Sequence, residues 1–185
     1  MPESPTKVVI IDDEPEIIEL VQLILKRKGF ELIGAVGGEA GLQVLKQVKP
    51  DLVMLDLMMS EGPEIYRRII DTLLNLYNPQ RQQEDSIPQP RKKVVCITGK
   101  SRATDLLLPI LELEQFIIIK VEGGQKGLDR LKQIRPDLVL VDPTLPDMRY
   151  GWEVYQRMKA DEEMPEIPVI IVIAPGQSKI DKVLK

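Results

Sequence analysis

The strongest constraint on the fold is an internal repeat, in which two stretches of the chain align without a gap. Residues 30–56, FELIGAVGGEAGLQVLKQVKPDLVMLD, match residues 116–142, FIIIKVEGGQKGLDRLKQIRPDLVLVD, and 14 of the 27 aligned positions are identical. The same offset of 86 residues places KVVIIDD at 7–13 on KVVCITG at 93–99. Shared helix periodicity alone does not produce so many identities, so the sequence predicts a tandem duplication.

Short apolar runs alternate with longer amphipathic stretches. The stretches between the apolar runs, such as PEIIELVQLILKRKG at 15–29, have apolar residues at helical spacing and end in basic residues and glycine. Because the apolar runs are apolar nearly throughout, helices should cover both faces of a parallel sheet. The pattern predicts an α/β protein with a doubly wound parallel sheet. Strands are predicted at residues 7–12, 30–36, 51–56, 93–98, 116–121, 137–142 and 168–174.

Composition excludes several classes of function. The 25 basic and 29 acidic residues give a net charge of −4, which argues against a nucleic-acid partner. No apolar run approaches the ~20 residues of a membrane span and no leader peptide is visible, so we expect a cytoplasmic protein with no membrane partner. The chain contains no histidine. Its chemistry must therefore come from carboxylates, hydroxyls and lysines.

Carboxylates gather where two predicted strands end. Asp12 and Asp13 end the first strand, and Asp56 ends the third. The carboxyl ends of parallel strands meet at one edge of an open sheet, so these side chains should lie within a few ångströms of one another. Two like charges 4 Å apart cost roughly 4 kcal/mol at an effective dielectric near 20, so the cluster should bind a cation or raise a pKa. Oxygen ligands suit Mg²⁺, and a carboxylate beside Mg²⁺ can attack a phosphoryl group.

The same residues carry a resemblance to a known family. VVIIDDEP, followed by PDLVMLDLMM, resembles the receiver domain of bacterial response regulators over at least residues 6–70. The resemblance implies a flavodoxin-like fold, internally duplicated here, in which a histidine kinase or phosphotransfer protein phosphorylates Asp56. It implies Mg²⁺ as cofactor, with Asp12, Asp13, Asp56 and the backbone carbonyl of Met58 as ligands. Such a receiver is no enzyme beyond self-catalysed phosphotransfer and autodephosphorylation.

The receiver family also has a Ser or Thr at the end of its fourth strand and a Lys at the end of its fifth. VVCITGKS offers Thr98 for the first role, and FIIIKV offers Lys120 for the second. In that assignment Thr98 would hydrogen-bond the phosphoryl group and Lys120 would pair with its charge. The match departs from the family at two positions, because Val121 stands in place of a proline and Ile117 in place of an aromatic residue.

Residues 93–121 therefore fit two assignments. They complete the first receiver, giving domains 1–135 and 136–185, or they begin a second copy, giving domains 1–90 and 91–185. The spacing between the threonine and the lysine supports the first assignment. The 14 identities support the second, which we favour.

A second copy has two consequences. Thr98 then stands where Asp12 stands, so Asp142, the counterpart of Asp56, lacks an acid pair and is interpreted as a turn residue. The first copy lacks its own fourth and fifth strands. Its open sheet edge must be covered by the second copy, by the polar segment at 78–92 or by another chain, as in a homodimer.

The sequence raises three possible functions. The first is a signalling receiver that is phosphorylated on Asp56 and acts through contacts with a downstream protein. The second is a pseudo-receiver scaffold that is never phosphorylated. An aspartyl-phosphate phosphohydrolase is disfavoured, because the second acid that this chemistry needs two residues past the nucleophile is Met58 here.

Overall fold

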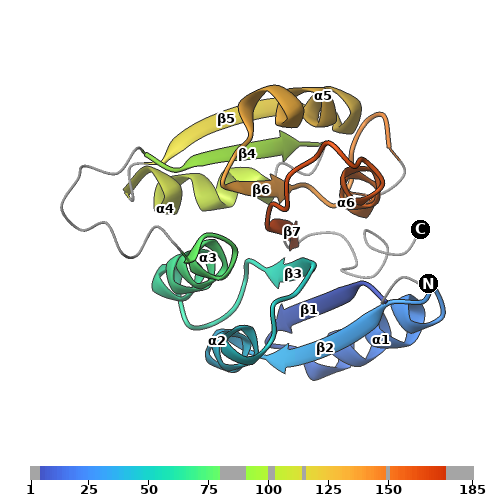
Figure 1. Ribbon diagram of the computed structural model, residues 1–185. Helices are drawn as coiled ribbons and strands as arrows, with labels where there is room; N and C mark the ends of the chain where they lie inside the picture. The colour runs from blue at the N-terminus through green and yellow to red at the C-terminus, as the bar shows by residue number, and fades with distance from the viewer. Residues whose placement is uncertain (1–4, 80–90, 100–102, 114–115, 149–150, 174–185) are drawn as a thin grey trace.

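The computed structural model describes residues 5–79, 91–99, 103–113, 116–148 and 151–173, and its ribbon is shown in Figure 1. Each strand agrees with the sequence prediction to within one residue at either end. The strands within the described residues are β1 (Lys7–Asp12), β2 (Glu31–Val36), β3 (Leu52–Asp56), β4 (Lys93–Thr98), β5 (Ile117–Glu122), β6 (Leu138–Val141) and β7 (Val169–Ile173). The helices are α1 (Pro15–Lys26), α2 (Gly38–Gln47), α3 (Pro63–Tyr77), the 3₁₀ helix η2 (Ala103–Leu107), α4 (Leu108–Leu113), α5 (Gly124–Ile134) and α6 (Trp152–Lys159).

Helix α1 illustrates how the sequence sets the local structure. It begins at Pro15, where a missing N–H costs nothing because the first helical amides have no intrahelical acceptor. Three apolar residues at helical spacing form its buried side: Ile18, Val21 and Leu25. Gly29 follows the helix with φ of +85°, a left-handed conformation that favours glycine and turns the chain into β2.

All the strands run parallel in one sheet, in the order β2-β1-β3-β7-β6-β4-β5. The two outer pairs have the same register, since Lys7 lies opposite Glu31 and Lys93 lies opposite Ile117. Strand β7 lies at the centre and pairs with both β3 and β6. The order therefore reads alike from both ends, and β7 takes the place of a fourth strand for each half of the molecule.

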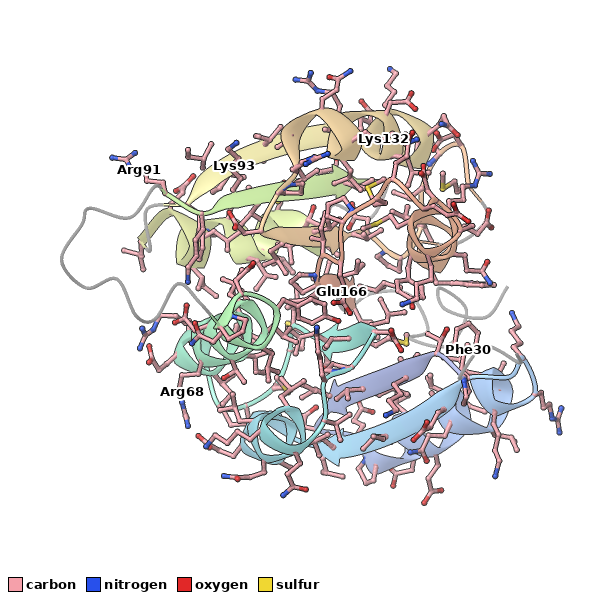
Figure 2. The ribbon with its side chains drawn as sticks, viewed as in Figure 1. Phe30, Arg68, Arg91, Lys93, Lys132 and Glu166 are labelled. Carbon is pink, nitrogen blue, oxygen red and sulfur yellow. The ribbon has the colours of Figure 1, made fainter. Side chains whose placement is uncertain are left out.

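The helices cover the two faces of the sheet in threes. Apolar side chains of α2, α3 and α4 pack on one face, and those of α1, α5 and α6 pack on the other (Figure 1). Corresponding helices of the two halves thus lie on opposite faces, as α2 and α5 do. This arrangement is the one expected for an approximate two-fold axis along β7. Arg68 of α3 reaches α2, where it pairs with Glu39 (Figure 2).

The topology bears on the two assignments of residues 93–121. These residues form β4 and β5, which lie on the far side of β6 and β7 from β3. They do not lie beside β3, where the fourth and fifth strands of a receiver at 1–135 would be expected. Strand β7 of the second half covers the open edge of β3. Most of the polar segment at 78–92 lies outside the described residues.

Two further features of the chain follow from the helices. Pro109 is the second residue of α4, which has six residues and follows directly on η2. A proline is tolerated there and would break a longer helix. In the part of the chain that the structure describes, no helix is long and apolar enough to cross a bilayer.

Candidate functional site

Asp12, Asp13 and Asp56 come together at the carboxyl edge of the sheet. One carboxylate oxygen from each lies within 4.8 Å of the others, which confirms the prediction that these side chains lie close together. Adjacent strands β1 and β3 place them, because Ile11 lies opposite Leu55 and both strands end one residue later. Asp12 and Asp56 are fully buried, whereas Asp13 is half-buried.

This cluster fits a hard divalent cation such as Mg²⁺. Its ligand atoms are all carboxylate oxygens, and the half-buried Asp13 leaves a side of the site open to water, which Mg²⁺ retains in most protein sites. Three carboxylates this close repel one another, and a divalent ion offsets that repulsion. One oxygen of Asp12 also accepts a hydrogen bond from the N–H of Glu14, at 2.9 Å, which fixes the start of the loop.

The loop after β3 is held by two side chains that the sequence analysis did not single out. The N–H of Met59 donates to the hydroxyl of Tyr66 at 3.1 Å. Burial and the nearby negative charge of Asp56 raise the pKa of this phenol. Glu61 accepts a hydrogen bond from the N–H of Gly38, the first residue of α2, at 2.6 Å. The loop that carries Met58 is therefore tied to α2 and α3, while the role of the Met58 carbonyl as a metal ligand stays a prediction.

The structure does not bring Thr98 and Lys120 to Asp56. Strand β4 lies three places from β3, or about 14 Å at the usual spacing between strands, and β5 is one strand further away. The hydroxyl of Thr98 donates to the carbonyl of Val121, and the ammonium of Lys120 pairs with Asp105 at 2.9 Å. Their assignment to the Asp56 site is corrected, because the sequence spacing of strands does not fix their order in the sheet.

Other residues occupy the strand ends beside Asp56. Its register partner on β7 is Ile173, which is buried, and the carbonyl of Ile173 accepts a hydrogen bond from Leu57 at 2.9 Å. The next strand, β6, is followed directly by Asp142. Within the described residues, the two strands that follow β3 in the sheet therefore end at an isoleucine and just before an aspartate.

Asp142 is the counterpart of Asp56 in the second half, and its surroundings differ. Its two carboxylate oxygens accept backbone hydrogen bonds from Gly99 and, at 3.2 Å, from Thr104. Gly99 stands at the position of Asp13, and a Cβ built there would collide with the carbonyl of Thr144. No side chain fits, so this edge cannot rebuild an acid pair. Asp142 instead holds the loop after β4, whereas the sequence analysis interpreted it as a residue of the turn that follows its own strand.

The internal repeat contains a signal that could have identified Glu61 from the sequence. The offset of 86 places Glu61 on Asp147, and Asp147 accepts hydrogen bonds from Gly124 at 2.6 Å and Gln125 at 2.8 Å. Each acid thus binds the amino end of the helix after the second strand of its half. Burial opposes the charge on Asp147, but these two N–H groups outweigh it and lower the pKa of the carboxyl.

Comparison with known proteins agrees with this architecture. The family model of the response regulator receiver domain matches residues 8–75 and 94–184. The chain belongs to this family. The match comes in two segments, one for each half of the sheet, and the gap between them includes the segment at 80–90 that lies outside the described residues.

Individual relatives support the same family. The chain is 31% identical over 104 residues to the alkaline phosphatase synthesis transcriptional regulatory protein PhoP of Bacillus subtilis, a match that covers 55% of this chain and 37% of that protein. It is 34% identical over 83 residues to the polar-differentiation response regulator DivK of Brucella anthropi, covering 45% of this chain and 67% of DivK. The chain thus spans little more than a third of the length of PhoP.

Among solved structures, the chemotaxis response regulator CheY4 of Vibrio cholerae is similar over 70% of this chain and 98% of its own, with 16% identity and a TM-score of 0.37. A putative response regulator with a GGDEF domain is similar over 97% of this chain, with 13% identity and a TM-score of 0.39.

Proposed function

We propose that the chain is a receiver in which Asp56 accepts a phosphoryl group in a reaction that needs Mg²⁺. The observation that carries the proposal is the clustering of Asp12, Asp13 and Asp56 at one sheet edge, with two of the three buried. A cluster of this kind is costly to bury unless a cation is bound. The cost is understandable if the site exists for chemistry rather than for stability.

The residues of the cluster would have two separate roles, metal binding and attack on phosphorus. Asp12 and Asp13, with the carbonyl of Met58, would hold Mg²⁺, which neutralises charge on the phosphoryl oxygens when bound. A carboxylate oxygen of Asp56 would attack phosphorus, forming an O–P bond as the bond to the donor histidine nitrogen breaks. The freed imidazole takes up a proton. These 185 residues contain no histidine, so they cannot supply the donor imidazole themselves.

A second candidate function is a scaffold that is never phosphorylated. It is favoured by Ile173 and Asp142, which lie where the next two strands end and supply neither a hydroxyl nor a lysine. A negative Asp142 two strands from Asp56 would disfavour a phosphoryl group rather than pair with it. Under this reading the acids at the edge are remnants, and the halves serve only to bind other proteins.

Intact-mass analysis after incubation with acetyl phosphate and Mg²⁺ tests the proposal. We expect the wild-type mass to rise by one phosphoryl group, since acetate can leave as the histidine would. The gain should disappear in Asp56→Asn and when Mg²⁺ is removed with a chelator. Asp142→Asn is the matched control, and it should label as the wild type does.

A donor protein completes the test, because acetyl phosphate is a weak donor for some acceptors. If neither acetyl phosphate nor a phosphorylated histidine phosphotransfer domain labels Asp56, the receiver proposal is wrong and the scaffold is preferred. Label that survives in Asp56→Asn and disappears in Asp142→Asn would move the phosphoacceptor to the second half.

We further propose that residues 1–90 and 91–185 are two receiver-like halves that fold as one unit. The shared strand β7 supports this division, as does the agreement in register between β1–β2 and β4–β5. A phosphorylated receiver of this kind would work in the cytoplasm and pass its signal on by contact with a downstream protein.

A further inference from the structure

An open apolar groove lies between α3 and α4, beside the loop that follows β3. Its cavity measures about 490 Å³. Both helices and the loop line it, with Leu57, Met58, Met59, Leu106, Ile110 and Leu113 among its walls. Of the six large apolar side chains that the described residues leave exposed, three gather here, namely Met58 (56%), Leu106 (52%) and Leu113 (83%). Single exposed apolar residues are ordinary, whereas a group around a hollow indicates a binding surface.

The two-fold arrangement supplies a counterpart on the other face, between α6 and α1. There the hollow shrinks to about 20 Å³, with Leu25, Phe30 and Trp152 in its walls. The indole of Trp152 meets the ring of Phe30 edge-on, with centroids 5.9 Å apart, and the ammonium of Lys28 lies 5.1 Å from the indole centroid. Phe30 is labelled in Figure 2, on the side of the sheet that carries α1. On this face, the chain fills the groove with its own indole.

One difference between the two hollows is the first residue of the helix beside each. GPEIY at 62–66 aligns with GWEVY at 151–155, which places Pro63 on Trp152. Each is the first residue of its helix, and the tyrosine three positions later is buried in both halves. The phenylalanine is retained as well, since Phe116 stands 86 residues after Phe30 and packs against the core of its own face. Proline is too short to cross the groove, so the hollow beside α3 stays open.

We infer that the groove between α3 and α4 binds an aromatic side chain, an indole in particular, presented by a partner protein. On the counterpart face, an indole packs between the corresponding helices α6 and α1. The single tryptophan of the chain is already packed there, so a second copy does not supply it. Met58 and Met59 adapt readily to a ring, because the thioether chain is flexible and makes favourable contacts with aromatics.

The position of the groove links it to the acid cluster. Met58 and Met59 follow Asp56 by two and three residues, so a bound ring would lie against the loop that begins at the proposed phosphoacceptor. Asp56 itself is not among the residues that line the groove. The inference therefore stands apart from the proposed function, and its test needs neither Mg²⁺ nor phosphate.

Methionine-methyl NMR tests the inference with free indole as the probe. The methyl groups of Met58 and Met59 are assigned by substitution to leucine, and indole is titrated into the full chain. We expect both signals to shift and saturate with a dissociation constant on the order of 1 mM, as suits a ligand of this size. Met164, which lines a different hollow at the opposite edge of the sheet, is the internal control and should not move.

Two variants distinguish binding in the groove from non-specific binding. Pro63→Trp should fill the groove from within, as Trp152 does on the other face, and Leu106→Asp should place a charge in its wall; both should weaken indole binding at least about tenfold. Pro63→Ala keeps the groove open and should bind as the wild type does. A thermal melt of each variant shows whether it is folded, and the NMR comparison uses the folded ones.

Three results would overturn the inference. Shifts at Met58 and Met59 that do not saturate, or that Met164 shares, would mean non-specific binding. Binding that persists in both Pro63→Trp and Leu106→Asp would place the indole elsewhere. Sedimentation showing a stable dimer that Leu106→Asp dissociates would mean that a second copy of the chain covers the groove.

Discussion

Asp56 and Asp142 end corresponding strands of the two halves, yet their neighbours give them opposite roles. Asp56 faces two further carboxylates at the end of β1, Asp12 and the following Asp13, whereas Asp142 accepts backbone N–H groups from the loop after β4. The strands around them pair in the same register. The comparison teaches that the frame of a receiver can be kept while its chemistry is lost, through changes at the end of one strand.

The largest effect is expected when the two halves are expressed as separate fragments. Strand β3 pairs with β7, which belongs to the second half, so a fragment of residues 1–90 has three strands and a bare apolar edge. We expect it to show no cooperative unfolding in urea, followed by circular dichroism. The fragment 91–185 keeps four neighbouring strands and should retain more structure. Sharp, independent unfolding of residues 1–90 as a monomer would show that the halves are separate domains.

Neutralising the two aspartates should change stability in opposite directions. Without divalent ions, Asp56→Asn relieves repulsion from Asp12 and Asp13 and should stabilise the fold by about 1–3 kcal/mol. Asp142→Asn removes a charged acceptor from two backbone amides and should destabilise by about 1–3 kcal/mol. Urea unfolding measures both. Changes of the same sign would contradict the opposite contributions of Asp56 and Asp142 to stability.

A smaller effect compares the glycines that begin α2 and α5. A Cβ at Gly38 would collide with Ile65, and one at Gly124 with Met148. Isoleucine is branched and stiff, whereas methionine can move aside. We expect Gly38→Ala to cost about 1–3 kcal/mol and Gly124→Ala to cost less, in thermal or urea unfolding. An equal loss in both variants would show that backbone fit, not the neighbouring side chain, sets the cost.

The smallest effect concerns the acids at the amino ends of the same two helices. Asp147→Ala should cost about 1 kcal/mol, and Glu61→Ala less, because Asp147 accepts two N–H groups and Glu61 accepts one. The pKa of Asp147 is lowered in the fold from a usual value of 3.8, so its contribution is present above that pH and is lost as the pH falls through the lowered pKa.

Unfolding at pH 7 and near pH 3 checks this point. The difference in stability between wild type and Asp147→Ala should shrink at the lower pH. A difference that stays constant would mean that the charge of Asp147 contributes nothing.

The sequence predicted every strand and the meeting of Asp12, Asp13 and Asp56, because both depend on local pattern and on where strands end. It did not predict which strand lies beside β3. The sequence of an apolar strand does not show which strands lie beside it. The spacing of Thr98 and Lys120 therefore fitted the receiver pattern, although β4 lies on the far side of β6 from β3. Glu61 was missed because a lone acid after a strand carries no signal until Asp147, its counterpart in the repeat, is set beside it.

The central place of β7 also bears on how the chain reaches its fold during synthesis. Val53 pairs with Ile170, so the middle of the sheet joins residues 117 positions apart and closes only after residue 170 has been made. Contacts this distant slow folding. Until β7 arrives, β3 and β6 both present unpaired edges to other chains, which favours aggregation. A chain that stops shortly before residue 169 would therefore lose far more than one strand: it would leave two half-sheets, each with an open edge suited to pairing with other copies.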